Sequence, residues 1–263
     1  MSYKTRRWHH PLAVLLGGVL LATGSARAAS PATETDLTTR GPAGTVKIAP
    51  EPGTAAPKPA ALTPQADAKP LGFKVNHVYR SGGQGPLKAL VDGSVLRSGD
   101  HYKIQFTPAE TSYVYIFQVD SSKAIYRLFP MTEFGGVKVN NLNPVRAGVT
   151  YQLPAKDKSF QLDSNVGSES ILFLAFRQPN PSLEQQYEDL VKARLSQDGP
   201  KANQLQTAIN GNFKTRGLAA IVDDPEKKTA TVPWTPTESF TVPVKRLDNL
   251  CADCINMITF EHR

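Results

Sequence analysis

The chain has 263 residues, of which 20% are charged, and its formal net charge is +7. Four of the 30 basic residues, but none of the 23 acidic ones, lie before residue 29, so residues 29–263 carry a net charge of +3. Such a weak charge excludes the basic stripe that is typical of a nucleic-acid-binding surface, and we expect no nucleic-acid partner.

The first residues have the three parts of a secretory signal peptide. Basic residues (Lys4, Arg6 and Arg7) precede an apolar run over Leu12–Ala22, and Ala26-Arg27-Ala28 then forms an A-x-A cleavage site. The apolar run has 11 residues, whereas a membrane-spanning helix needs about 20. We therefore predict that residues 1–28 are removed, with an uncleaved anchor as the alternative. The residues that define the cleavage site are Ala26, Ala28 and Ala29.

This signal predicts export by the general secretory route, to the periplasm or outside the cell, with no membrane span left after processing. From Ala29 to Pro70 the chain has eight prolines, ten alanines and no aromatic residue. Such a segment cannot bury enough apolar surface to offset the entropy of ordering it. We therefore predict a disordered linker over 29–70, followed by one β-rich globular domain over 71–263.

Short runs of aromatic and branched residues, separated by turn formers, predict strands in this domain. Two runs, Tyr113–Val119 and Ile171–Phe176, are apolar at nearly every position and are expected to be central strands covered on both faces. His101–Thr107 alternates and is expected to have one wet face. The other predicted strands are Phe73–Tyr79, Ala124–Phe129, Val149–Leu153, Phe160–Leu162, Leu218–Val222, Thr229–Val232, Phe240–Val244 and Ile255–Phe260.

The turn formers lie between these runs without intervening helices, which favours an antiparallel β-sandwich, immunoglobulin-like or related. They include Ser98-Gly99-Asp100, Asp120-Ser121-Ser122 and Gly135-Gly136. One helix is predicted over Ser182–Ser196, opened by a capping box of Ser182 with Gln185. A weaker one is predicted over Ala202–Ile209, ending at Asn210-Gly211. We expect one or both helices to pack on the sheet.

Several pieces of the sequence occur in the order of a known family. They are Leu96–Phe106, Tyr113–Asp120, Leu128-Phe129-Pro130, Ala147-Gly148 with Tyr151–Pro154, and Gly167-Ser168-Glu169. Residues 88–176 resemble the bacterial domain-of-unknown-function family numbered 4384. The resemblance implies an exported β-rich accessory module found beside envelope or signalling domains, and it transfers no active-site residues.

Cys251-Ala252-Asp253-Cys254 is the sharpest local motif, and its cysteines are the only two in the chain. In an oxidising compartment two cysteines normally pair, so we predict a Cys251–Cys254 disulfide. A thiol–disulfide enzyme is the alternative, but its reactive cysteine belongs at a helix start, and Ile255–Phe260 is predicted to be a strand. Residue 255 is Ile, where haem attachment needs His.

The remaining candidate groups do not form a recognised site. His77, His101 and His262 have no zinc-ligand spacing. The Gly-rich segment 81–86 lacks the Lys-Ser/Thr of a phosphate-binding loop, and there is no G-x-S-x-G motif. We therefore predict no catalytic residues, no cofactor and no metal. Trp234, in a loop between prolines, is the candidate for an exposed partner contact.

Together these features favour an exported, non-enzymatic accessory module that binds another protein or a cell-wall component of the envelope. Two alternatives stay open: a periplasmic thiol–disulfide enzyme that uses Cys251 and Cys254, and a structural subunit of a secretion or surface assembly whose edge strands pair with neighbours. The sequence leaves the oligomeric state and the identity of the partner open.

Overall fold

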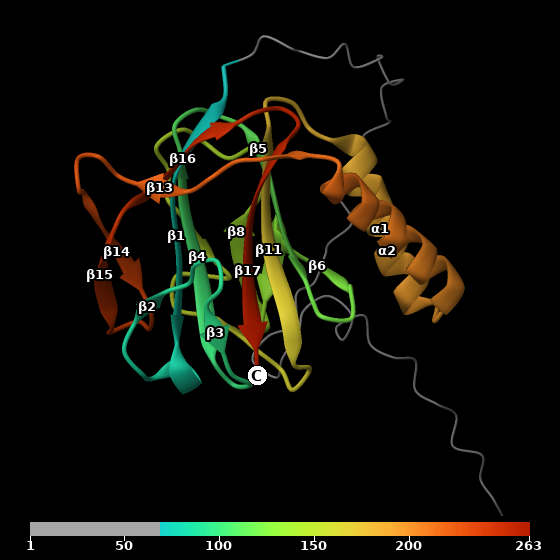
Figure 1. The fold of residues 1–263 in the computed structure, drawn as a ribbon, viewed down its shortest axis with the longest axis horizontal. Helices are drawn as coiled ribbons and strands as arrows, with labels where there is room; N and C mark the ends of the chain where they lie inside the picture. Colours follow the sequence, from blue (N-terminus) through green and yellow to red (C-terminus); the bar gives the residue numbers. More distant parts are fainter. Residues whose placement is uncertain (1–68) are drawn as a thin grey trace, which may run out of the picture. The chain divides into compact units, whose positions relative to one another are not determined.

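The computed structural model describes residues 69–263 (Figure 1). The predicted signal peptide, its cleavage site at Ala26, Ala28 and Ala29, and all of the predicted linker except Lys69 and Pro70 lie outside the described residues. The described part is mainly β, and two sheets pack face to face with a pair of helices on one side. The prediction of a β-sandwich with packed helices is confirmed.

Within residues 69–263, the first sheet has seven strands. Its central strand, β1, pairs antiparallel with β4 from Phe73 to Arg80, and on its other edge with β16 and then β2. The strands are β1 (Leu71–Arg80), β2 (Lys88–Ala89), β4 (His101–Pro108), β9 (Tyr151–Leu153), β10 (Phe160–Gln161), β13 (Val222–Asp223) and β16 (Lys245–Leu250).

The second sheet has six strands in the described part of the chain, and β11 lies at its centre between β17 and β5. Its strands are β3 (Val95–Leu96), β5 (Tyr113–Val119), β6 (Ile125–Phe129), β11 (Gly167–Phe176), β12 (Gly217–Leu218) and β17 (Cys254–His262). The two short strands β3 and β12 pair with β17 in parallel, so the sandwich is antiparallel except at this edge.

The main core fills the space between the sheets. Alternation along the strands sends every second side chain inward. Phe73, Ile104 and Phe106 of the first sheet meet Ile116 and Phe173 of the second, and all five side chains are buried. Phe106 and Phe173 pack edge to face with ring centroids 5.4 Å apart. Each buried side chain of this size contributes roughly 1.5–3 kcal/mol to folding.

Two helices cover the outer face of the second sheet, on the right in Figure 1. They are α1 (Pro181–Leu195) and α2 (Gly199–Lys214). Tyr187 packs against Phe117 at 5.6 Å between centroids, and Phe213 packs against the same ring at 5.3 Å. The second sheet is therefore buried on both faces, as the apolar runs 113–119 and 171–176 predict.

The helix α1 also covers the outer edge of β6. The Tyr187 hydroxyl accepts a hydrogen bond from the amide of Arg127 at 2.9 Å. The guanidinium of Arg194 donates to the carbonyl oxygen of Ile125 at 2.9 Å. An open strand edge is a template for pairing with another chain. The hydrogen bonds with these two side chains satisfy backbone groups of β6 that would otherwise be free to pair with another strand.

Both helices differ from their predicted bounds. The side chain of Asn180, not Ser182, caps α1 by accepting from the Leu183 amide at 3.0 Å, so Pro181 is the first helical residue. The predicted capping box with Gln185 is wrong. The helix α2 continues through Asn210-Gly211 to Lys214, because Phe213 is buried against the sheet and extends the apolar face by one turn. None of the helices in residues 69–263 is long and apolar enough to cross a membrane.

A hairpin of β14 (Thr229–Pro233) and β15 (Ser239–Pro243) covers the outer face of the first sheet, on the left in Figure 1. Gln105 and Lys103, both on β4, donate to the carbonyl oxygens of Thr231 at 2.8 Å and Pro233 at 2.6 Å. The face of β4 that alternation predicts to be wet is therefore buried, because the hairpin lies over it.

The remaining differences concern β strands. The predicted strand Leu218–Val222 is wrong as one unit: residues 217–218 pair in the second sheet and residues 222–223 in the first, so the chain crosses between the sheets at 219–221.

The strands β7 (Met131–Phe134) and β8 (Val137–Asn141) form a hairpin that the sequence did not predict, although its turn, Gly135-Gly136, was recognised. Both glycines have positive φ (57° and 75°), which suits a tight hairpin turn. Residues 81–83 form a short 3-10 turn, η1 (Ser81–Gly83).

Candidate functional site

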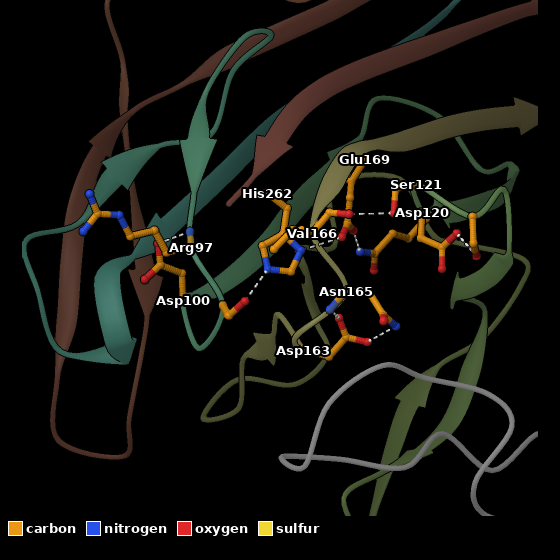
Figure 2. A network of polar contacts seen from close by, with 12 residues as sticks. Arg97, Asp100, Asp120, Ser121, Asp163, Asn165, Val166, Glu169 and His262 are labelled. Atoms are coloured by element: carbon orange, nitrogen blue, oxygen red, sulfur yellow. Dashed lines mark hydrogen bonds and ion pairs between the residues drawn. The ribbon is translucent and has the colours of Figure 1, made fainter.

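A buried polar network lies between the sheets near the carboxyl end of β17 (Figure 2). His262 Nδ1 lies 2.9 Å from Glu169 Oε1, and both side chains are fully buried. Gln118 of β5 donates to the other oxygen of Glu169, and the hydroxyl of Tyr102 on β4 donates to Gln118 Oε1 at 2.7 Å. The network therefore joins strands of both sheets.

An exposed serine extends this network to the surface. Ser98 Oγ lies 3.1 Å from His262 Nε2. The order of hydroxyl, imidazole and carboxylate is that of a nucleophile with its base and an orienting acid. The sequence did not predict this arrangement, because Ser98, Glu169 and His262 are far apart in the chain and belong to no catalytic motif.

Acyl transfer also needs amide donors for the oxyanion, normally close to the nucleophile. Here the amide of Ser98 donates to the carbonyl oxygen of Arg263 at 3.2 Å, and the amide of Gly99 donates to that of Leu162 at 2.9 Å. Neither amide is available for an oxyanion at Ser98. Instead, these hydrogen bonds link the turn at Ser98 to strand β17 and, through His262, to the buried Glu169.

Aspartates hold the turns around this network. Asp100 accepts from the amides of Gly82 and Arg97, each at 2.9 Å. Asp120 accepts from the amide of Ala124 at 2.8 Å. The predicted turns at Ser98-Gly99-Asp100 and at Asp120 are confirmed, and Gly99 has the positive φ, 83°, that the first of them requires.

A groove opens at one lateral edge of the sandwich and encloses about 1240 Å³. One wall is the segment 86–92 with β2, and the other is the crossover 218–223 together with residues 240–243 of β15. The bottom is formed by β1 and β17, through side chains that alternation directs between the sheets. These include Val75, His77, Asn256 and Ile258.

His77 and Asn256 are two of the buried polar residues that line the groove, and Asn76 is a third. His77 is 6% exposed, and its Nε2 has no hydrogen-bond partner among residues 69–263. Burial lowers the pKa of His77 from 6.5 to about 4, so its imidazole is neutral at physiological pH. The Asn256 amide nitrogen donates to the Ala219 carbonyl oxygen at 2.8 Å. Buried polar atoms normally have partners, which makes the unpaired nitrogen of His77 notable.

The rim of the groove is apolar and exposed. Among residues 69–263 nine large hydrophobic side chains are exposed, and four of them line this groove: Val91, Leu218, Val222 and Met257. Single exposed apolar residues are ordinary, but a cluster beside a concave surface marks a binding site. The groove is thus the place on the described surface where apolar exposure gathers.

The predicted disulfide between Cys251 and Cys254 is confirmed. The two cysteines close the turn between β16 and β17, where the amide of Cys254 donates to the carbonyl oxygen of Cys251 at 3.0 Å. A redox-active cysteine is normally activated at a helix start, and this pair lies between two strands instead. Arg216 donates to the carbonyl oxygen of Ala252 at 3.3 Å and holds the turn.

The exposure predicted for Trp234 is wrong, since its side chain is only 4% exposed. Its indole nitrogen donates to the carbonyl oxygen of Gly83 at 3.1 Å. The guanidinium of Arg80 lies 5.3 Å from the ring and the ammonium of Lys103 lies 5.8 Å from it. Trp234 anchors the β14–β15 hairpin on the first sheet and is not available for a partner.

The three histidines are held by separate contacts. His77 lies in the groove, His101 Nδ1 lies 2.8 Å from Ser159 Oγ, and His262 belongs to the network with Glu169. Within the part of the chain that the structure describes, there is no group of three His, Cys, Asp or Glu side chains arranged to hold a metal ion.

The fold and these sites define a helix-backed β-sandwich domain with a lateral groove. Residues 95–179 match the family described as Domain of unknown function (DUF4384). No curated protein and no solved structure matches the chain. The match covers Ser98 and Glu169, whereas every residue that lines the groove lies outside it. The groove is therefore built by parts of this chain that the family does not describe.

Proposed function

We propose that the chain is an exported, non-enzymatic module that binds another component of the cell envelope in the groove between the sheets. The observation that carries this proposal is the cluster of four exposed apolar side chains around a concave surface whose floor holds a buried polar group. The envelope location rests on the signal-peptide pattern of residues 1–28, and the predicted linker 29–70 would hold the domain away from the amino terminus.

The two alternatives have less support. A thiol–disulfide enzyme needs an activated cysteine, and the disulfide here closes a turn between strands. A subunit that assembles through its strand edges needs open edges, and the β6 edge is occupied by Tyr187 and Arg194.

The test compares two matched variants of the exported protein. Met257 in the groove and Val137 on β8 are exposed strand residues, at 42% and 44%. Glutamate at either position should leave folding intact, because neither side chain belongs to the core. We expect M257E to lose retention on immobilised envelope fractions, separated into lipid, glycan and protein pools, and V137E to be retained like the wild-type protein.

Equal retention of M257E and the wild-type protein on every pool would overturn the proposal. Turnover of a peptidoglycan, peptide or glycan substrate by the purified protein would do the same, if a point mutation abolished that turnover without unfolding the chain. An insulin-reduction assay tests the thiol–disulfide alternative directly, and we expect no reduction.

A further inference from the structure

We infer that the groove takes an uncharged ligand, with an apolar body and one hydroxyl or amide group that hydrogen-bonds to His77 and Asn256 at its floor. This inference rests on the proposed function and names the class of molecule that the groove selects. Four features carry it: the apolar walls, the balanced charges of the rim, the chemistry of the floor and the paired strand edges beside the groove.

The walls fit an apolar body. Leu87, Leu90 and Ile221 supply apolar side chains along them, and Phe240 and Val242 of the hairpin close one side. Binding sites for small molecules are concave and mostly apolar, with a few polar groups that fix orientation. The groove, at about 1240 Å³, has room for a body larger than a single side chain.

The charged residues of the rim leave no net charge to attract an ion. The lining contains two lysines and two aspartates. Lys245 is paired with Asp223, and Asp92 accepts from the amide of Thr259 at 2.9 Å. Lys88 lies over the ring of Tyr79, with its ammonium 5.8 Å from the centroid. Lys88 and Asp92 are exposed at the rim. A charged head group at the floor would therefore lose its hydration without meeting an opposite charge among the floor side chains Val75, His77, Asn256 and Ile258, which is unfavourable.

The floor selects a group that both donates and accepts. A neutral imidazole has one donor nitrogen and one acceptor nitrogen. The Asn256 amide also offers a donor and an acceptor, and its nitrogen already donates to Ala219. A hydroxyl or an amide of the ligand matches both residues, whereas a carboxylate only accepts and an ammonium only donates.

An extended peptide strand fits this groove less well. Strand addition needs a row of unpaired backbone groups along a sheet edge. Here the amide of Leu90 donates to the carbonyl oxygen of His77 at 2.9 Å, and the amides of Ala219 and Gly93 donate to those of Ile255 and Thr259 at 2.9 and 2.8 Å. The edges on both sides of the groove are thus largely occupied by the chain itself.

The test uses the full chain, the neutral dye Nile red as a fluorescent probe, and three unbranched competitors of ten carbon atoms each. Decanol, decanoate and decylammonium differ only in the charge and bonding of the head group. At neutral pH we expect decanol to displace the dye at a concentration at least about tenfold lower than either charged competitor, since a charge entering the groove must be desolvated. Equal displacement by all three would overturn the inference.

Variants locate the effect at the floor. H77F keeps an aromatic ring and removes both nitrogens, and we expect the advantage of decanol over decanoate to fall about fivefold, as loss of one hydrogen bond predicts. H101F is the matched control, since His101 lies outside the groove and is bonded to Ser159. N256L provides a second variant if H77F does not fold. An unchanged advantage in a folded H77F or N256L would overturn the role given to the floor.

The two proposals fail separately. If decanol has no advantage while M257E still loses envelope binding relative to V137E, the class of ligand is wrong and the groove remains the binding site. If M257E and V137E bind the envelope component equally, the proposed function itself is wrong.

Discussion

The ammonium of Lys103 lies 2.6 Å from the carbonyl oxygen of Pro233, and this hydrogen bond joins the first sheet to the β14–β15 hairpin. The Lys103 side chain is fully buried and also donates to the carbonyl oxygen of Lys156 at 2.8 Å. Its partners are carbonyl oxygens, which compensate a buried positive charge less completely than a bonded carboxylate would. The hairpin is thus held partly by a cation that burial disfavours.

The first prediction concerns the pH dependence of this contact. Burial lowers the pKa of Lys103 from 10.5 to about 8, although Asp157 nearby acts in the opposite direction. Between these values the unfolded chain binds a proton that the folded chain has released, so the free energy of unfolding should rise with pH by up to about 3 kcal/mol. Urea unfolding from neutral pH to above the unfolded pKa measures this rise. K103M should reduce the rise of the free energy of unfolding with pH. K74M, at an exposed position of β1, should leave the rise unchanged. An equal rise in the wild-type protein and in K103M would show that Lys103 is not its source.

The sequence predicts the strands of the core well where alternation or a continuous apolar run marks them. The predicted strand Tyr113–Val119 has the bounds of β5, and the predicted strand at His101–Thr107 differs from β4 by one residue. The strand β16 was missed because its buried residues, Leu247 and Leu250, are three apart. A bulge opposite β1 explains this spacing: Leu250 pairs with Leu71 and Leu247 with Phe73.

The sites could be predicted much less well than the fold. The disulfide was found because both cysteines lie in one short motif. The burial of Trp234 was not predicted, because it depends on how a hairpin far along the chain lies over β1 and β4. His77 and His262 gave no local signal either: His77 lies in an ordinary alternating strand, and the partner of His262, Glu169, is 93 positions away.

The second prediction separates a structural from a catalytic role for the Ser98–His262–Glu169 network. E169A removes one partner of a fully buried pair, which should cost about 3–5 kcal/mol in the free energy of unfolding. E169Q keeps an acceptor and should cost less. Ser98 is exposed, so S98A should change stability by no more than about 0.5 kcal/mol. Chemical denaturation measures the stability of all three variants. If a fluorophosphonate labelled Ser98 in the wild-type protein and not in E169Q, Ser98 would instead be a nucleophile.

The third prediction concerns the covered edge of β6. Y187F removes the acceptor of the Arg127 amide, and R194A removes the donor to the Ile125 carbonyl oxygen. With both groups unpaired, the edge becomes a template for another copy of the chain. We expect the double variant to associate with increasing concentration in analytical ultracentrifugation, unlike R97A, which changes an exposed arginine outside the helix layer. A double variant that sediments like the wild-type protein would show that the helices protect this edge by other contacts.

The fourth prediction concerns the disulfide. It closes a loop of only four residues, so in the chain-entropy description its removal should cost about 2 kcal/mol. The double variant C251A/C254A should therefore fold and unfold at a lower urea concentration, with the same dependence on denaturant. Reducing agent should shift the wild-type protein by a similar amount and leave the double variant unchanged. A larger loss, or failure to fold, would mean that the disulfide holds more than the turn between β16 and β17.

The last prediction uses the buried histidine of the groove. The pKa of His77 is about 4 in the folded chain because of burial, against 6.5 when unfolded. Between these values the unfolded chain binds the proton that the folded chain excludes, so stability is complete above pH 6.5 and falls as the pH drops toward 4. The loss over this window should approach about 3 kcal/mol. H77F has no imidazole to take up this proton on unfolding, so it should lose less stability over the same pH range. H101F changes a half-buried histidine that is bonded to Ser159, and it should lose nearly as much stability as the wild-type protein. A ligand that bonds to neutral His77 binds only the folded chain, so saturating decanol should raise the wild-type midpoint at neutral pH, and this rise should shrink in H77F.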